Sequence, residues 1–213
     1  MLKASTKDLN HLLGNIDLYL LDQVLKARFD QNDAILDAGC GEGRNLIYFI
    51  RHGYHAWGID RDEDSIQMLK YLAKSLNRDY PQDRFTSGLV EELPYQDEQF
   101  DAVISSAVLH FAENDGHFDQ MVAELNRVLK KGGMLFLRMT TIVGIEDQVK
   151  PLGDGKYLLP DESVRYLLTR EKLNDLVGTF DGTFVEPFKT VLVDKQRSMC
   201  SLVLQKGNGS KQL

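Results

Sequence analysis

Three glycines spaced by one residue each, close after a short apolar run, constrain the fold of this chain more than any other feature. Residues 34–36 have the composition of a strand covered on both faces, and Gly39, Gly41 and Gly43 permit positive φ or a close approach of the backbone to a bound molecule. Apolar residues within 46–50 follow helical spacing, so a helix is predicted to begin near Gly43 with its positive dipole end toward a ligand. This order predicts an α/β domain that binds a nucleotide-like molecule.

The spacing of the glycines separates two classes of nucleotide ligand. A dinucleotide fingerprint, Gly-x-Gly-x-x-Gly counted from Gly39, would have its third glycine at the position of Arg44. Asp37 stands at the end of the strand, where its carboxylate would repel a pyrophosphate and accept hydrogen bonds from a cationic ligand. The pattern therefore favours a nucleotide that carries a cation.

The run from Asp37 to Gly43, Asp-Ala-Gly-Cys-Gly-Glu-Gly, resembles motif I of the class I S-adenosylmethionine-dependent methyltransferases, Asp/Glu-x-Gly-x-Gly-x-Gly. Its continuation through Arg44-Asn45 is similar to the small-molecule type that includes the tellurite-resistance methyltransferases. Asp60, Leu93-Pro94 and Phe100-Asp101 match later parts of the same pattern. The resemblance covers roughly residues 33–206.

The resemblance implies a doubly wound α/β fold with a seven-stranded, mostly parallel sheet in the order 3-2-1-4-5-7-6, an antiparallel last hairpin and helices on both faces. Apolar periodicity predicts one amphipathic helix over 5–29 and later helices over 62–76, 118–129 and 168–177, the last stopped by Gly178. The strands after the first are predicted at 54–59, 84–87, 100–106, 134–140, 183–193 and 198–204. Residues 141–164 hold several Gly and Pro residues and no sustained period, and are expected to form an irregular lid.

Composition limits the remaining possibilities. The 213 residues suit one methyltransferase domain over 33–206, preceded by a helical segment over 1–32 and followed by a flexible tail over 207–213. The net charge of −7 argues against a nucleic-acid partner, and no apolar run approaches the ~20 residues of a membrane span. No secretory core and no Cys/His spacing for zinc are visible. We expect a cytoplasmic monomer or weak homodimer that acts on a small molecule without a metal.

Asp60 is the second anchor of the expected cofactor site. It follows the second strand, roughly 20 residues after motif I, where a carboxylate can accept both hydroxyl donors of a ribose. The family commonly has an acid where this chain has Leu89, so the adenine amino group must be recognised by Glu91 or adenine by the Val90 backbone amide. The complete cofactor-site prediction is Asp37, Ala38, Gly39, Cys40, Gly41, Gly43, Arg44, Asp60, Arg61, Leu89, Val90, Glu91 and Ser105, with Ser106 beside it.

No residue is assigned to catalysis from the sequence, and three are candidates: His110 after the fourth strand, Arg138 within the fifth, and Tyr157 in the lid. A charge in a central strand needs a partner, so Arg138 is expected to be paired. A sulfonium methyl group is already activated, and a general base is needed only if the acceptor is protonated. The resemblance implies S-adenosylmethionine-dependent methylation of a small molecule. A sensor of S-adenosylmethionine or its demethylated product, and a nucleotide-dependent oxidoreductase, are the alternatives.

Overall fold

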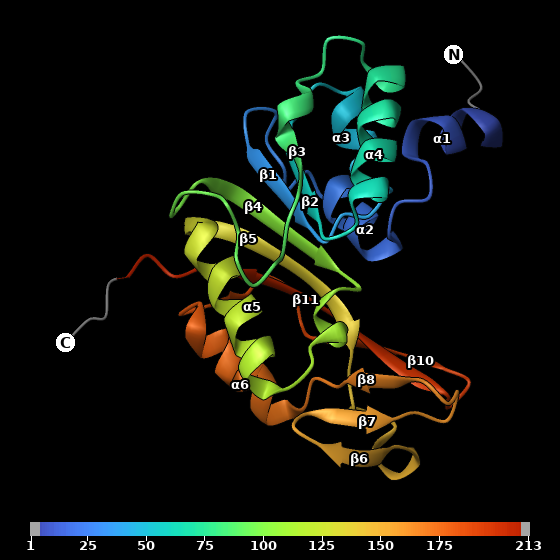
Figure 1. Ribbon diagram of the computed structural model, residues 1–213, viewed down its shortest axis with the longest axis vertical. Coiled ribbons are helices and arrows are strands. Elements are labelled where there is room, and N and C mark those ends of the chain that lie inside the picture. The colour runs from blue at the N-terminus through green and yellow to red at the C-terminus, as the bar shows by residue number, and fades with distance from the viewer. Residues whose placement is uncertain (1–4, 210–213) are drawn as a thin grey trace.

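The computed structural model describes residues 5–209 and contains an eight-stranded sheet with helices on both faces (Figure 1). The strands are β1 (Ala34–Ala38), β2 (His55–Asp60), β3 (Phe85–Ser87), β4 (Phe100–Ser106), β5 (Leu129–Thr140), β9 (Thr183–Phe184), β10 (Lys189–Val193) and β11 (Arg197–Gln205). Their order is β3-β2-β1-β4-β5-β11-β10, and β9 also pairs with β11. The strands from β3 to β5 are parallel, whereas β11 is antiparallel to β5 and β10.

This topology confirms the predicted sheet order and the reversed last hairpin, with one difference. The sixth predicted strand, 183–193, is divided into β9 and β10 because the chain leaves the sheet between them. Pro187 lies in this interruption, and proline has no N–H to donate to a strand partner. The main sheet therefore has eight strands rather than seven.

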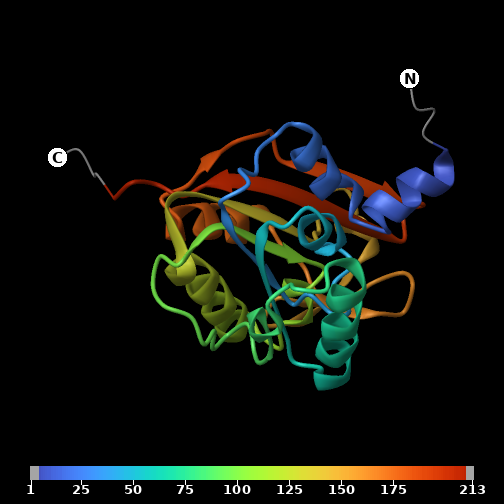
Figure 2. The ribbon, with the colours of Figure 1, turned by 90° about the horizontal axis from the view of Figure 1, so that it is seen from above.

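The helices are α1 (Thr6–Leu13), α2 (Leu18–Leu25), α3 (Ile47–Arg51), α4 (Glu63–Leu76), α5 (Asp115–Val128) and α6 (Arg170–Thr179), with short 3-10 segments at Gln82–Arg84, Leu109–Phe111 (η2) and Glu146–Gln148. Residues of α5 and α6 form one buried apolar cluster with the sheet, and residues of α2, α3 and α4 form a second. Figure 2 shows α2 and α5 on opposite sides of the sheet. Alternate residues of β1 follow this division: Ile35 packs in the second cluster and Leu36 in the first.

Three helix predictions need correction. The single helix over 5–29 is two helices, because Gly14 ends α1 with φ of +61° and Asp17 begins α2 by accepting the Tyr19 backbone N–H at 2.9 Å. The helix after the glycine turn begins at Ile47 and has only five residues. The prediction that it begins near Gly43, with the positive end of its dipole at the glycine turn, is therefore wrong. Gly178 lies inside α6 rather than after it, since the helix continues to Thr179.

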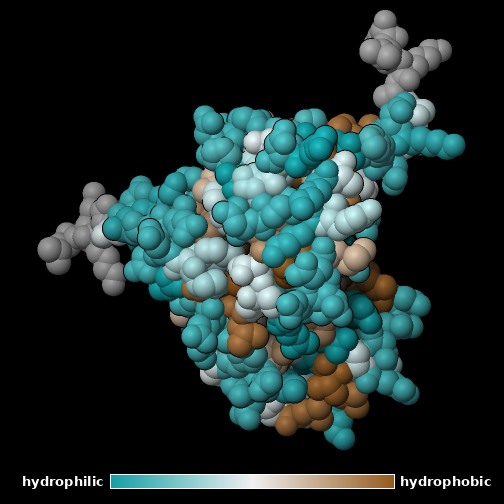
Figure 3. Space-filling model, turned by 45° about the horizontal axis from the view of Figure 1, so that its top comes forward, coloured by the Kyte–Doolittle hydropathy of each residue, from teal (hydrophilic) through white to brown (hydrophobic). Residues whose placement is uncertain are grey.

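The predicted irregular lid contains a separate antiparallel sheet, formed by β6 (Lys150–Gly153), β7 (Lys156–Leu158) and β8 (Val164–Tyr166). It lies at the opposite end of the molecule from α3 and α4 (Figure 1). Tyr166 fixes it to α5, because its ring stacks on Phe118 at 4.6 Å and its hydroxyl donates to Asp115 at 2.6 Å. Figure 3 shows hydrophobic residues gathered at this end, which agrees with the exposure of Leu152 and Val164.

The start of the predicted flexible tail is held by hydrogen bonds. The Gly207 N–H donates to the Phe180 carbonyl at 3.1 Å, and just before it Lys206 Nζ donates to the Asn126 and Leu129 carbonyls. Residues 210–213 of that tail lie outside the described residues, as do residues 1–4 of the N-terminal segment. None of the described helices combines the length and apolar character needed to cross a membrane.

Candidate functional site

A pocket of about 510 Å³ opens at the carboxyl ends of β1, β2, β3 and β4. Ligands of open parallel sheets bind at this edge, close to the point where the strand order reverses. Loops after the four strands form much of its wall, and the first turn of α4, η2 and the first half of α5 complete it. The lining residues are Gly39, Asp60, Arg61, Asp62, Ser65, Gly88, Leu89, Val90, Glu91, Ala107, Val108, Phe111, Glu113, His117 and Met121.

The three glycines have positive φ, as the sequence predicts, but they differ in what a side chain at each position would contact. A Cβ on Gly39 would lie 2.3 Å from a methyl of Val108, and one on Gly43 would lie 2.3 Å from a methyl of Leu69. A Cβ on Gly41 would meet nothing within 4 Å. The turn therefore uses two glycines for close packing within the protein, and only the middle glycine faces open space.

Asp60 connects the glycine turn to the start of α4. Its Oδ2 accepts the Gly41 N–H at 2.8 Å, and its Oδ1 accepts the Asp62 N–H at 3.0 Å. An ionised carboxylate has about four lone-pair sites, so each oxygen can accept one further hydrogen bond. Asp60 thus orders the turn and still offers acceptors to the pocket that it lines.

The loop after β3 supplies Leu89, Val90 and Glu91 to the pocket wall. Glu91 Oε1 lies 3.3 Å from His117 Nε2, on α5. His117 Nδ1 accepts the Glu113 N–H at 3.2 Å, so in the neutral ring the proton is on Nε2 and faces the carboxylate. The sequence analysis did not single out His117 or Glu113, since nothing local indicates that the residues just before the predicted 118–129 helix face this loop.

Seven predicted site residues do not line the pocket: Asp37, Ala38, Cys40, Gly41, Gly43, Arg44 and Ser105. Asp37, Ala38 and Ser105 have no exposed surface, because their side chains point into the buried faces of the sheet. Cys40 is buried too, and its burial raises the pKa of the thiol, which supports the expectation of a packing residue.

Asp37 is nevertheless an unusual buried group. Neither carboxylate oxygen has a hydrogen-bond partner among the described residues, and burial raises the pKa of this carboxyl to about 7, opposed by the nearby Arg44 guanidinium. The Ser106 hydroxyl and Arg138 Nε are also buried without partners. Ser106 and Arg138 are side by side on β4 and β5. Unpaired polar groups at this edge mark a place suited to a polar ligand.

Arg138 has the partner that the sequence analysis requires. Its Nη1 donates to Asp17 Oδ2 at 2.6 Å, and its guanidinium lies 5.3 Å from the centre of the Tyr19 ring. Asp17 precedes α2 and is itself buried. The N-terminal segment is therefore tied directly to the carboxyl end of β5.

His110, the second catalytic candidate, lies in η2 and is only 7% exposed. Its Nδ1 has no hydrogen-bond partner in the part of the chain that the structure describes. Burial lowers the pKa of the ring to about 4, helped by the positive charges of Arg165, Arg197 and Arg138. The His110 imidazole is therefore neutral at pH 7. Tyr157, the third candidate, lies on β7 opposite Arg165 of β8.

Residues 36–137 match a family model described as a methyltransferase domain. This part of the chain is therefore similar to a methyltransferase domain. An uncharacterized methyltransferase of Bacillus subtilis (strain 168) is 32% identical over 125 residues, which are 59% of this chain and 48% of that protein. The chain spans about half the length, or less, of the curated relatives it matches. All residues that line the pocket lie within the residues that match this family model.

Solved structures share the fold of the methyltransferase domain and its flanking elements. A protein of Pyrococcus horikoshii OT3 has 19% identity and a TM-score of 0.70, with 92% of this chain and 95% of that one covered. Magnesium protoporphyrin IX methyltransferase from Synechocystis PCC 6803, solved with bound SAH, has 16% identity and a TM-score of 0.69, with 96% and 89% covered. These similarities confirm the fold that the sequence predicts.

Proposed function

We propose that this protein transfers a methyl group from S-adenosylmethionine to a small-molecule acceptor. The family match supports methyl transfer and S-adenosylmethionine as the cofactor. The observation that carries the proposal is the position of Asp60, which holds the three-glycine turn and faces the pocket at the carboxyl edge of the sheet.

The pocket has complementary groups for each part of this cofactor. The free lone pairs of Asp60 suit the ribose hydroxyls, and Arg61 lies beside it. Glu91, whose carboxylate faces His117 Nε2 in the pocket wall, can accept the adenine amino hydrogen that Leu89 cannot accept. Asp37, whose carboxylate has no hydrogen-bond partner among the described residues, suits the cationic methionine end through an intervening amide or water.

The chain's contribution to methyl transfer is then to bind, orient and exclude water. The cofactor supplies an activated methyl group, and alignment of the acceptor behind it provides much of the acceleration. His110 is neutral at pH 7 and its low pKa makes it a weak base. An acceptor that is already deprotonated, or an uncharged nucleophile, fits this site better than one that needs a strong base.

Replacement of Asp60 tests the cofactor site. Asp60→Asn removes the charge of the ribose acceptor, so S-adenosylhomocysteine should bind roughly 10- to 150-fold more weakly in calorimetry. Asp64→Asn, an exposed acid on α4, is the matched control and should leave affinity unchanged. Thermal melting must show that Asp60→Asn folds, because Asp60 also accepts two backbone N–H groups. An unchanged dissociation constant in the folded variant would remove Asp60 from the site.

Two further measurements separate the alternatives. Mass spectrometry of acceptor mixtures incubated with S-adenosylmethionine distinguishes an enzyme from a sensor, because only an enzyme forms methylated product. Failure of NAD to displace S-adenosylhomocysteine disposes of the oxidoreductase. The division into residues 1–32, 33–206 and 207–213, the monomer or weak homodimer and the cytoplasmic location stay predictions.

A further inference from the structure

Three arginines that follow the pocket residues in the sequence bring positive charge close to His110. Arg138 comes from β5, Arg165 from β8 and Arg197 from the start of β11, and all three add positive charge at the His110 ring. The β8 and β5 strands both pack next to η2, which carries His110. A chain with a net charge of −7 thus concentrates cations at one point, beside the mouth of its pocket.

Two of these cations are already neutralised. Arg138 donates to Asp17, and Arg197 forms a close ion pair with Asp161. Arg165 has no carboxylate within ion-pair distance among residues 5–209, and its Nη1 donates only to the Val164 carbonyl. Its guanidinium therefore keeps unused donors, and a guanidinium presents them in a planar fork that matches a carboxylate.

Arg165 also lies against a residue of the pocket wall, although it is not itself one of the lining residues. Its guanidinium carbon lies 5.1 Å from the centre of the Phe111 ring, and Phe111 lines the pocket while remaining 53% exposed. Next to Phe111, His110 is only 7% exposed, and its Nδ1 has no hydrogen-bond partner among residues 5–209. A buried ring nitrogen without a hydrogen-bond partner is an independent indication that a polar ligand binds beside His110.

We propose that the methyl acceptor carries a carboxylate, which Arg165 binds beside His110 while Phe111 packs against the body of the molecule. The proposal rests on the proposed function, because it assigns the acceptor class of that same site. Arg165, His110 and Phe111 are here specificity residues, and the carboxylate is an anchor rather than the methylated group.

Nuclear magnetic resonance tests this directly with benzoate as the probe and benzamide as its uncharged counterpart. The protein is labelled at its five histidines, saturated with S-adenosylhomocysteine, and His110 is assigned by the loss of its signals in His110→Asn. Benzoate should shift the His110 signals saturably and benzamide should not. Equal responses to the two probes, or no saturable response to benzoate, would overturn the proposal.

Variants of Arg165 and a control arginine show where the carboxylate binds. Arg165→Gln should weaken the benzoate response roughly tenfold or more, and Arg165→Lys, which keeps the charge but loses the fork, should weaken it less. Arg84→Gln is the matched control, because Arg84 also lies over an aromatic ring, at 4.5 Å, but that ring, Trp57, is not in the pocket lining, whereas Phe111 is. An unchanged benzoate response in Arg165→Gln overturns the assignment.

The outcomes also separate this proposal from the function on which it rests. Wild-type protein that binds S-adenosylhomocysteine but shows no benzoate response refutes the acceptor class alone. Protein that fails to bind S-adenosylhomocysteine refutes the proposed function. If turnover is found, matched carboxylic acids and amides should differ mainly in KM, and Arg165→Gln should abolish that difference.

Discussion

Asp37 and His110 are two buried titratable residues whose pKa values are shifted in opposite senses. The pKa of Asp37 rises from 3.8 to about 7, so its contribution to stability is complete below pH 3.8 and is lost as the pH rises toward 7. The pKa of His110 falls from 6.5 to about 4, so its contribution is complete above pH 6.5 and is lost as the pH falls toward 4. Between about pH 4 and 6.5 the two effects oppose each other.

Single replacements should uncover each effect in the protein without cofactor. Relative to wild type, Asp37→Asn should make the free energy of unfolding increase more steeply with pH between about 4 and 7, by up to about 1.4 kcal/mol per pH unit. His110→Asn should change the slope in the opposite direction between about 4 and 6.5. Urea unfolding across this range measures both. Parallel pH profiles for wild type and both variants would contradict this account.

At the scale of single elements, the helices and strands that could be predicted from the sequence are those with a local pattern of apolar residues. The apolar runs of the main strands and the faces of α4 and α5 were recognisable, and motif I, Asp60 and the Leu89 loop were assigned from their residues. The small sheet was missed because all four residues of β6 are exposed, so no alternation of buried and exposed positions is present. His117 was missed because its role comes from α5 packing beside the loop after β3, a tertiary contact.

The small sheet depends on a tight turn at Gly153-Asp154-Gly155, where all three residues have positive φ. A Cβ on Gly155 would lie 2.1 Å from the Tyr166 ring, which is fully buried and cannot move away. A Cβ on Gly153 would meet nothing within 4 Å. The two glycines therefore share the need for a positive φ, but only Gly155 is closely packed against a side chain.

Gly155→Ala should be clearly more harmful than Gly153→Ala. Each substitution incurs about 1–3 kcal/mol from the backbone conformation, and Gly155→Ala adds about 1–3 kcal/mol from overpacking against Tyr166. Hydrogen exchange should rise over 150–166, and the benzoate response should weaken because β8 carries Arg165, whereas S-adenosylhomocysteine affinity should be retained. Equal unfolding free energies for the two variants would show that the Tyr166 contact is unimportant.

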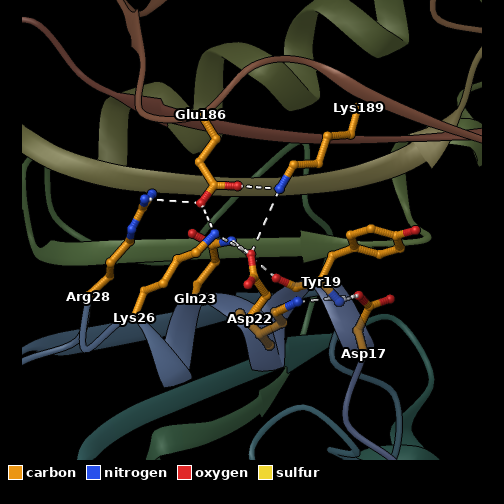
Figure 4. Close-up of polar contacts among 9 residues, drawn as sticks. Asp17, Tyr19, Asp22, Gln23, Lys26, Arg28, Glu186 and Lys189 are labelled. Atoms are coloured by element: carbon orange, nitrogen blue, oxygen red, sulfur yellow. Dashed lines mark hydrogen bonds and ion pairs between the residues drawn. The ribbon is translucent and has the colours of Figure 1, made fainter.

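At the scale of the whole molecule, α2 joins the functional edge of the sheet to its outer strands. Asp17, which caps the first turn of α2, binds Arg138 near the site. Just beyond its last turn, Lys26 and Arg28 bind Glu186, which lies between β9 and β10 and also binds Lys189 (Figure 4). The Glu186 side chain is only 9% exposed, and hydrogen bonds from Lys189 and Lys26 lower its pKa to about 2. The helix is therefore fastened at both ends.

Glu186→Gln should weaken the attachment of the C-terminal end of α2 to the segment between β9 and β10. It leaves three cations, Lys26, Arg28 and Lys189, facing a neutral amide. The expected loss is about 1–3 kcal/mol of unfolding free energy at neutral pH, and it should shrink in high salt because Lys26 and Lys189 are 40% exposed. It should also shrink as the pH falls from about 4.5 toward 2, where wild-type Glu186 itself becomes protonated. The control is Asp119→Asn, which breaks the ion pair of a 59% exposed carboxylate with Lys172 and should change stability by less than about 1 kcal/mol. Urea unfolding at low and high salt compares them, and equal losses in the two variants would reduce the Glu186 cluster to an ordinary surface ion pair.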